Sequence, residues 1–371
     1  DTIVVEACTG RPTRLDEIDP SDGFWVHGVD GDLRPVVRQV THWVDNGVRD
    51  TVTLTLANGM TLTGTPDHPV LTERGWIGLA ELTADDHVAT APELLEPIEP
   101  VTMSSARLRL LGYLIGDGSL ATGSSITFVN RDERLLDEFE AVVAAAFPTT
   151  RPSRYVGSNG VTRITVGNGK GNGGGASPLL LWLRDLGLKA PIRAEAGGVL
   201  SHEKFVPTCV FEASNDAVGR FVAALWDCDG HVGERMAFYR TVSPRLAEDV
   251  RRLLLRLGFD APVYSAEYST GRGVPRTAYQ VTVYDGPRFA ALIAPHLACE
   301  HKREALFDAQ SRGTTLPRAE VMSGVRNAST ASIRRLSQEL GIASWHFSPY
   351  ASERHPRVHV ETIASALAVL D

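Results

Sequence analysis

Two short segments of the 371-residue chain repeat one pattern, and this repetition constrains the fold more than any other feature. Residues 110–118 read LLGYLIGDG, and residues 222–230 read VAALWDCDG. In each segment two small residues stand four positions apart: Gly112 and Gly116 in the first, Ala224 and Cys228 in the second. Residues i and i+4 lie on one face of a helix, so the segments predict two helices that pack closely along their small residues.

Each segment ends in an aspartate followed by a glycine, which is expected to stop the helix. Asp117 and Asp229 are then expected side by side, at the ends of two adjacent helices. Two neighbouring carboxylates repel each other unless a cation or a proton lies between them. The pattern therefore predicts a divalent metal site formed by Asp117 and Asp229 on a pseudo-two-fold axis. The alternative is a pair of buried helices whose aspartates are incidental caps.

The segments that follow the two motifs also match. After the first motif we expect a strand, a helix, two strands and a helix, at residues 126–129, 132–147, 154–156, 162–166 and 178–186. After the second motif the same order is expected at residues 236–239, 244–257, 262–265, 278–283 and 287–294. Asp229 follows Asp117 by 112 residues, so the chain contains an internal duplication. The paired motifs and their flanks resemble the LAGLIDADG homing endonucleases in their single-chain, two-repeat form, over roughly residues 101–310.

This resemblance implies an α+β endonuclease that cuts both strands of a long double-stranded DNA site. It implies that Asp117 and Asp229 bind Mg²⁺ and that a metal-activated water attacks the phosphate in line. It also assigns catalytic roles to two of the four lysines. Lys204, in the segment HEKFVP, matches the family's Lys-x-Ile/Val-Pro block, and Lys302 stands at the corresponding place after the second repeat. The alternative for both is a surface lysine.

The distribution of charge is compatible with DNA binding, although the net charge is −8. Residues 1–100 carry 6 basic and 18 acidic residues, whereas residues 101–310 carry 24 basic and 22 acidic residues. The acidity thus belongs to the N-terminal region, and the motif-bearing region is free to carry a basic face. Seven arginines on its expected strands and loops either bind phosphate or face solvent: Arg151, Arg154, Arg163, Arg235, Arg240, Arg272 and Arg276.

The first hundred residues are expected to form short strands and turns. Strands are expected at residues 36–44, 51–56 and 61–63, with Asn58-Gly59 as a hairpin turn. Thr65 and His68 follow, then a Gly-Trp turn and a short LAEL element. This order resembles the Hint fold of inteins and hedgehog-type autoprocessing domains. The resemblance implies that Thr65 hydrogen-bonds the N-terminal scissile peptide, and that His68 polarises it and protonates the departing amine.

The nucleophile of such a splicing reaction is expected a few residues before Asp1. Asp1-Thr2 matches the fifth and sixth places of the family's opening pattern, Cys-x-x-Gly-Asp-Thr. Cys8 is the rival nucleophile, and its other interpretation is a small residue in a turn. The family closes with a strand pair, a second His and a terminal His-Asn. None of these is recognised after Leu316, so they are expected outside the chain.

The expected architecture is multidomain. Residues 1–98 would form the N-terminal part of a mostly β, horseshoe-like Hint domain. Residues 99–310 would form the endonuclease, with repeats at 101–210 and 211–310. Residues 311–371 would form a helical accessory or bridging segment, with helices at 330–340 and 358–370. The chain has neither a long apolar run nor a C-x-x-C pair, and a cytoplasmic monomer without membrane contact is expected.

The sequence therefore predicts an intein: an autocatalytic splicing element that carries a Mg²⁺-dependent homing endonuclease. Its expected partners are the DNA of the intein-less allele and a flanking host protein, for which bacterial replicative DNA helicases are the nearest likeness. One alternative is a DNA-binding regulator built on a LAGLIDADG scaffold. Another is an intein whose nuclease has decayed.

Overall fold

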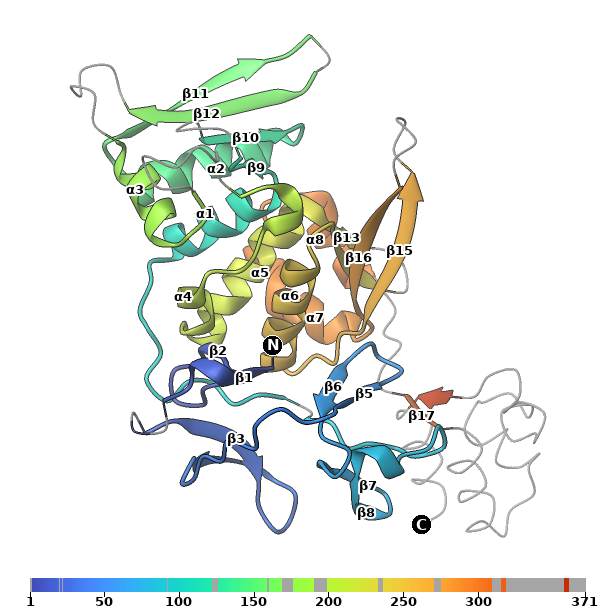
Figure 1. Cartoon of the computed structure of the whole chain (residues 1–371). Coiled ribbons are helices and arrows are strands. Elements are labelled where there is room, and N and C mark those ends of the chain that lie inside the picture. Colours follow the sequence, from blue (N-terminus) through green and yellow to red (C-terminus); the bar gives the residue numbers. More distant parts are fainter. Residues whose placement is uncertain are drawn as a thin grey trace, which may run out of the picture.

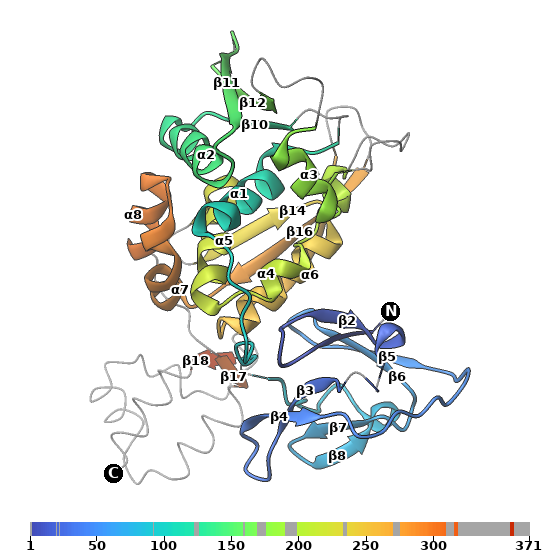
Figure 2. The same cartoon turned by 90° about the vertical axis from the view of Figure 1, so that its left-hand side faces the viewer.

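The computed structural model describes residues 2–19, 21, 23–91, 93–121, 126–158, 160–168, 176–189, 199–232, 236–269, 275–308, 315–317 and 357–359. These residues form two lobes (Figures 1 and 2). A lobe of short β-hairpins is drawn in blue at the bottom of both views, and a larger α/β lobe lies above it. The main hydrophobic core lies in the α/β lobe and runs from Leu108 to Leu306.

Two buried helices form the centre of the α/β lobe. They are α1 (Ser105–Gly116) and α5 (Asn215–Asp229). Each begins after a serine whose hydroxyl accepts a hydrogen bond from a main-chain N–H of the first turn, Ser104 from Arg107 and Ser214 from Ala217. Such caps satisfy N–H groups that have no partner within the helix. The apolar residues of both helices are buried almost completely, as expected for helices that are packed on all sides.

The first repeat surrounds the end of α1 with a four-stranded antiparallel sheet in the order β11-β12-β10-β9. These strands are β9 (Gly118–Ser119), β10 (Ile126–Asn130), β11 (Thr150–Val156) and β12 (Thr162–Asn168). Helix α2 (Glu133–Ala146) links β10 to β11, and α3 (Pro178–Asp185) follows β12. Ile126 and Phe128 alternate with less buried neighbours, so one face of the sheet joins the core and the other is open.

The second repeat has the same order of elements. Its sheet runs β13-β14-β16-β15, from β13 (Gly230–Val232), β14 (Ala237–Thr241), β15 (Val263–Ser269) and β16 (Pro275–Val283). Helices α6 (Pro244–Arg256) and α7 (Gly286–Ile293) occupy the places of α2 and α3. The duplicated order of elements is therefore confirmed. The strands β11, β15 and β16 extend further than the expected ranges, because exposed polar residues continue the pairing beyond the apolar core.

Short elements connect and follow the repeats. The turn η4 (Ser201–Glu203) and helix α4 (Thr208–Phe211) lie between the repeats, and α8 (Glu300–Asp308) follows the second one. Beyond it, β17 (Thr315–Pro317) pairs with β18 (Arg357–His359). Val358 and His359 thus lie in a strand, and the expected helix at 358–370 is wrong at its start. The strand pair also corrects the expectation that none follows Leu316. The expected helix at 330–340 lies outside the described residues.

The N-terminal lobe consists of four hairpins that do not join into one sheet within the described residues. They are β1 (Ile3–Val5) with β2 (Pro12–Arg14), β3 (Trp25–Val29) with β4 (Pro35–Gln39), β5 (Val52–Thr55) with β6 (Thr61–Gly64), and β7 (Pro69–Thr72) with β8 (Gly75–Gly78). The turn at Asn58-Gly59 is confirmed, and Gly59 has a φ of 84° that favours glycine. The strand expected at 36–44 ends at Gln39, because the residues after it have no strand partner.

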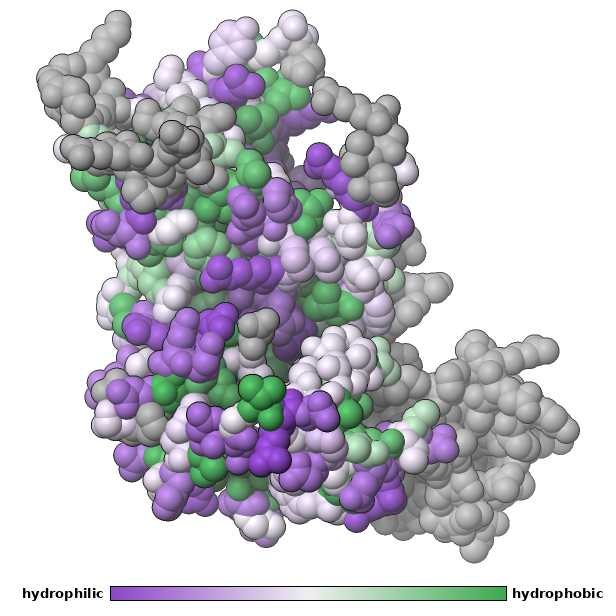
Figure 3. All heavy atoms as spheres, in the orientation of Figure 1, coloured by the Kyte–Doolittle hydropathy of each residue, from purple (hydrophilic) through white to green (hydrophobic). Residues whose placement is uncertain are grey.

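Among the described residues, none of the helices is long and apolar enough to cross a bilayer. On the face in Figure 3, apart from the grey atoms, hydrophobic and hydrophilic residues are mixed without one large apolar patch.

Candidate metal centre and DNA-binding surface

The two central helices meet along the small residues that the motif pattern singles out. A Cβ on Gly112 would lie 2.6 Å from the Cβ of Ala224 and 2.9 Å from the carbonyl oxygen of Phe221. A Cβ on Gly116 would overlap both the Cβ and the Sγ of Cys228. The predicted facing of Gly112 with Ala224 and of Gly116 with Cys228 is confirmed. Only glycine permits this approach, so the two helix ends are held side by side.

The two helices end at the Asp-Gly pairs as expected, but the glycines do not stop them in the expected way. Neither Gly118 nor Gly230 has a positive φ, so neither ends its helix in the left-handed conformation. A Cβ on Gly118 would overlap the Leu114 carbonyl, and one on Gly230 would overlap the Trp226 ring. The missing side chain lets the first strand of each repeat fold back tightly under its own helix. This tight return fixes where Asp117 and Asp229 leave the helices.

The pKa values of both aspartates are raised above their usual range, mainly by burial. Burial, together with the nearby Asp117 carboxylate, raises the pKa of Asp229 to about 6. Asp229 is exposed to solvent, and it lines a pocket between the end of α1 and the second sheet. Burial also raises the pKa of Asp117, while hydrogen bonds from Asn130 and Cys228 oppose that shift. Two adjacent oxygen donors of this kind suit Mg²⁺, which commonly takes one or two carboxylates and leaves its other positions to water and phosphate.

Asn130 is a site residue that the sequence did not reveal. Its Nδ2 donates to Oδ2 of Asp117 at 2.6 Å, from the last residue of β10. Its Oδ1 accepts from the main-chain N–H groups of Arg131 and Asp132, which fixes the orientation of the amide. Asp229 accepts no hydrogen bond from any described residue and is the freer of the two carboxylates. No third His, Cys, Asp or Glu joins them as a metal-binding cluster within the described residues.

The two lysines implied by the resemblance cap the two helix ends. Lys204 is buried, and its Nζ donates to the carbonyl of Gly116 at 2.6 Å, at the end of α1. The Nζ of Lys302 donates to the carbonyls of Trp226, Asp227 and Cys228 at 2.9, 2.8 and 3.1 Å, at the end of α5. A cation is favoured at a helix C-terminus, where main-chain carbonyls have no partner. Both ammonium charges also oppose the rise in pKa of Asp117 and Asp229.

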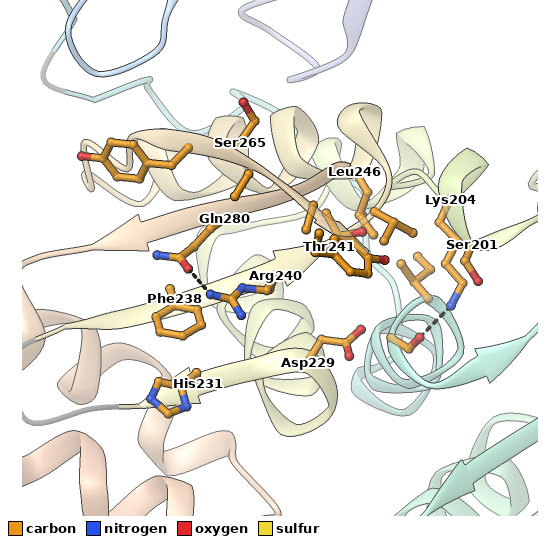
Figure 4. A pocket seen from close by; sticks show the side chains of 17 residues that line it. Ser201, Lys204, Asp229, His231, Phe238, Arg240, Thr241, Leu246, Ser265 and Gln280 are labelled. Carbon is orange, nitrogen blue, oxygen red and sulfur yellow. Dashed lines mark hydrogen bonds between the residues drawn. The ribbon is translucent and has the colours of Figure 1, made fainter. Parts of the chain in front are cut away.

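A pocket of about 930 Å³ opens from Asp229 over the free face of the second sheet (Figure 4). Lys204 lies at one side of it. The side chains of His231 and Phe238 stack with ring centroids 4.5 Å apart, and the guanidinium of Arg240 lies 5.1 Å from the Phe238 ring. Arg240 also donates to Oε1 of Gln280 at 2.8 Å. The pocket therefore carries an oriented arginine and amide, both of which can bind bases or phosphates.

The seven arginines of the basic-face prediction divide into three groups. Arg163 is exposed on the free face of the first sheet, since its strand neighbours Thr162 and Ile164 face the core. Arg151, Arg240 and Arg276 are also exposed. Arg154 instead points to α2, where it pairs with Glu133, Asp137 and Glu140 at 2.7–2.9 Å. It is neutralised there, so the phosphate-binding interpretation is wrong for Arg154. Arg235 and Arg272 lie outside the described residues.

The residues assigned to splicing lie at the junction of β6 and β7. The main-chain N–H of His68 donates to the Thr65 carbonyl at 2.9 Å, and Gly64 leaves room for the imidazole. The Thr65 hydroxyl hydrogen-bonds Asp67, which lowers the pKa of that carboxyl. The His68 side chain is exposed. Neither Thr65 nor His68 is hydrogen-bonded to residues 2–5, and Asp1 lies outside the described residues, so their roles stay predictions.

The environment of Cys8 does not favour a nucleophile. Burial raises the pKa of its thiol, and the nearby Glu6 carboxylate adds to this rise. A thiolate is the reactive form of cysteine, so a raised pKa makes the side chain less nucleophilic at neutral pH.

Comparison with known proteins finds a family model that matches the second repeat. Residues 216–293 match the family model described as "LAGLIDADG-like domain". The match includes most of α5, all four strands of the second sheet and α7. The α+β LAGLIDADG fold is thus shown for the second repeat. The first repeat has the same order of elements and supplies the other central helix.

The chain is similar to parts of curated proteins that have different names. The chain is 29% identical over 377 residues to "Protein RecA" of Mycobacterium tuberculosis (strain ATCC 25618 / H37Rv), covering 87% of this chain and 45% of that protein. It is 30% identical over 275 residues to "Replicative DNA helicase DnaB" of Rhodothermus marinus, covering 70% of this chain and 28% of that protein. The chain thus spans less than half the length of these relatives.

Solved structures with detectable similarity include homing endonucleases. The crystal structure of I-DmoI in complex with DNA and Mn aligns with 51% of this chain at 15% identity, with a TM-score of 0.33. The alignment covers 96% of the I-DmoI chain. Full-length DUF199/WhiA from Thermatoga maritima aligns with 72% of the chain at 10% identity, with a TM-score of 0.34, and is covered to 94%.

Proposed function

We propose that the chain is an intein: a Hint splicing element that carries a two-repeat LAGLIDADG homing endonuclease. The observation that carries the nuclease part is the contact of α1 with α5 through Gly112, Gly116 and their partners. That contact places the ends of α1 and α5, which carry Asp117 and Asp229, side by side. Carboxylates in this position are costly for a structural helix pair, because both are partly desolvated and each repels the other.

Asp117 and Asp229 would hold a divalent cation, with Mg²⁺ as the expected one. When bound, it would polarise the scissile phosphate and activate the attacking water. Asn130 fixes one oxygen of Asp117, so that its other oxygen remains available. Lys204 and Lys302 keep positive charge beside the carboxylates and the position that the phosphate would occupy. Such fixed charge stabilises the extra negative charge of a pentavalent phosphate.

Double-stranded DNA would lie across the free faces of the two sheets, with the acid pair at the centre. Arg163 on the first sheet and Arg240 on the second would contact phosphates or base edges from either side of the centre. The pseudo-two-fold relation of the repeats suits a DNA duplex, because each repeat would contribute to cutting one of the two strands.

The splicing part rests on the order of motifs in the N-terminal lobe and on the relatives. RecA and the replicative helicase DnaB are differently named proteins, yet this chain matches a part of each at 29–30% identity. An inserted element carried by different host proteins explains such a pattern. Thr65 and His68 would act at the N-terminal scissile peptide, and the host protein would flank the chain.

Plasmid cleavage tests the nuclease. Purified protein is mixed with supercoiled plasmid that carries the uninterrupted host gene, with Mg²⁺ or with EDTA. Linear product with Mg²⁺ alone is expected, and Asp117→Asn should abolish it while leaving the affinity for the same DNA in EDTA unchanged. Asp185→Asn, at the exposed end of α3, is the matched control and should cut normally.

The same experiment separates the alternatives. Site-specific binding without cutting would assign the chain to a DNA-binding regulator or to an intein with a decayed nuclease. Thiol-induced cleavage of a precursor then separates these two, since only the intein would release its N-terminal flank.

A further inference from the structure

Two buried aspartates outside the acid pair each bind the main chain of a lysine-bearing segment. They are Asp249, on α6, and Asp227, on α5, with exposed fractions of 5% and 2%. A buried carboxylate is costly unless hydrogen bonds satisfy it. Both accept main-chain N–H donors from segments remote in sequence, which suggests that they hold those segments in place.

The segment of Lys204 is held by α6. Oδ2 of Asp249 accepts from the main-chain N–H of Val206 at 3.0 Å, in a buried position. The hydroxyl of Ser243, which also caps α6, donates to the carbonyl of Lys204 at 2.6 Å. The guanidinium of Arg245 lies 4.2 Å from the centre of the Phe205 ring. The main chain from Lys204 to Val206 is thus fixed on α6, while the ammonium group of Lys204 reaches the end of α1.

The segment of Lys302 is held by α5 itself. Oδ2 and Oδ1 of Asp227 accept from the main-chain N–H groups of Ala298 and Cys299, each at 2.9 Å. These residues stand just before α8, the helix that carries Lys302. The hydroxyl of Tyr113, on α1, donates to the same Asp227 carboxylate at 3.3 Å. His301, beside Lys302, lies 3.6 Å from Asp132 at the start of α2.

The contacts around each lysine include residues of the other repeat. Lys204 follows the first repeat, but Asp249, Ser243 and Arg245 belong to the second. Lys302 follows the second repeat, but its surroundings include Tyr113 and Asp132 of the first. The placement of Lys204 therefore depends on α6 of the other repeat. Lys302 is held mainly by α5 of its own repeat, and Tyr113 of the first repeat supports it through Asp227.

We propose that Asp249 and Asp227 are positioning residues that hold Lys204 and Lys302, respectively, at the two halves of the cleavage centre. The proposal rests on the proposed nuclease function for its effect on cutting, but the placement itself is a property of the protein without metal or DNA. Asp249 is the residue of choice for a test, because it lies on α6 and does not neighbour the acid pair. Without an acceptor, the buried Val206 N–H loses its partner and the segment is released.

Chemical labelling tests the placement without any nuclease activity. The metal-free protein is treated with an amine-reactive reagent, and the labelling rate of each lysine is measured by mass spectrometry. In Asp249→Leu the rate at Lys204 should rise about tenfold or more, because a buried hydrogen bond to a charged group is lost. Asp249→Asn keeps an acceptor for Val206 and should leave the rate within a factor of about two. Lys302 and the buried Lys189 report general loosening and should not change.

A second variant pair covers the case in which Asp249→Leu does not fold. Ser243→Ala removes the hydrogen bond to the Lys204 carbonyl together with the cap of α6. Ser177→Ala removes an equivalent buried cap from α3, which does not contact the segment of Lys204 through any hydrogen bond among the described residues. Faster labelling of Lys204 in Ser243→Ala but not in Ser177→Ala supports the proposal. Equal labelling of Lys204 in wild type, Asp249→Leu and Ser243→Ala would overturn it.

Plasmid nicking then relates the placement to cutting. Because each lysine stands at one helix end, Asp249→Leu should slow one strand, and nicked circles should accumulate with the nick always in the other strand. Asp227→Leu should give nicks in the opposite strand. If wild-type protein does not cut the plasmid, the proposed nuclease function is wrong. The labelling rates would still test whether Asp249 positions Lys204. If labelling responds but both strands slow equally, the assignment of one lysine to each strand is wrong.

Discussion

Asp229 is the residue whose acidity gives the most direct test of the site. The folded-state pKa of about 6 lies above the value of about 3.9 for an unfolded aspartate. Folding therefore favours the protonated form, and this carboxyl lowers stability progressively as the pH rises from about 4 to about 6. Asp229→Asn removes this effect. In EDTA at pH 7.5 the variant should unfold at a higher temperature than wild type, and below about pH 4 the difference should vanish.

Scanning calorimetry across this pH range measures the effect. Asp185→Asn serves as the control, because Asp185 is exposed at the end of α3 and lies outside the site. An unchanged difference between Asp229→Asn and wild type from pH 4 to pH 8 would show that Asp229 does not titrate in the folded state as described. The repulsion from Asp117 would then be absent as well.

The site residues that could be predicted from the sequence are those that belong to local sequence patterns. Asp117 and Asp229 end repeated motifs, and the lysines stand in or near a short block, so each was recognisable from a few neighbours. Asn130 and Asp249 were not predicted. Their role depends on which remote main-chain or side-chain atom they reach, as with Asp249 and Val206, 43 positions apart. No spacing in one sequence encodes such a contact.

The packing of α1 on α5 is the element on which the site depends, and two glycines provide a matched test. Gly112→Ala places a Cβ 2.6 Å from that of Ala224, and overpacking of this kind should lower the free energy of unfolding by about 1–3 kcal/mol. Gly219 lies in the other helix, α5, and an added Cβ there meets the Leu292 side chain at an ordinary 3.6 Å. Gly219→Ala should raise the free energy of unfolding by up to about 1 kcal/mol, since alanine favours the helix.

Urea titrations of both variants check this prediction. If Gly112→Ala is as stable as Gly219→Ala, the helices are not held in the contact described here. Cleavage assays of Gly112→Ala add a second measurement, because separated helix ends would also separate Asp117 from Asp229.

The hairpin of β11 and β12 provides a matched pair for DNA binding. Arg163 and Arg154 are neighbours on this hairpin but face opposite sides of the sheet. Arg163→Ala should weaken DNA binding and lower the slope of log K against log salt by about one. Arg154→Ala should leave the slope unchanged, because three carboxylates of α2 already neutralise that guanidinium. Titrations of labelled duplex at several salt concentrations measure both slopes, and a larger loss in Arg154→Ala would place the DNA elsewhere.

The elements of the α/β lobe were predictable because their hydrophobic periods are strong and occur twice. The helices at 132–147 and 244–257 match α2 and α6 within one residue at each end. The N-terminal lobe was less predictable. Among its described hydrophobic residues only Ala7, Val70 and Leu79 are buried, so weak alternation of side chains gives little information about where strands end. The strand expected at 36–44 was too long for this reason.

At the scale of the whole molecule, polar contacts join the two lobes. Arg11 pairs with Glu212 at 2.5 Å, and Asn58 donates from its Nδ2 to Asp260 at 3.2 Å. The main-chain N–H of Val263 also donates to the carbonyl of Asn58 at 3.3 Å. None of these residues belongs to the metal centre or to the Thr65–His68 turn. The lobes are thus docked through surfaces that leave both candidate sites intact.

Because the two sites lie in different lobes, splicing and DNA cleavage should fail independently. His68→Ala removes the group that would protonate the departing amine, and loss of such a general acid slows its step by about 10²–10⁴-fold. Thiol-induced release of the N-terminal flank from a precursor should slow accordingly, while plasmid cleavage by the same protein stays normal. Asp117→Asn should give the reverse pattern. An unchanged rate of thiolysis in His68→Ala would contradict the Hint assignment but would not affect the nuclease proposal. Slow thiolysis in both variants would instead mean that the metal centre supports splicing through the contacts of Arg11 and Asn58, which Arg11→Ala would then reproduce.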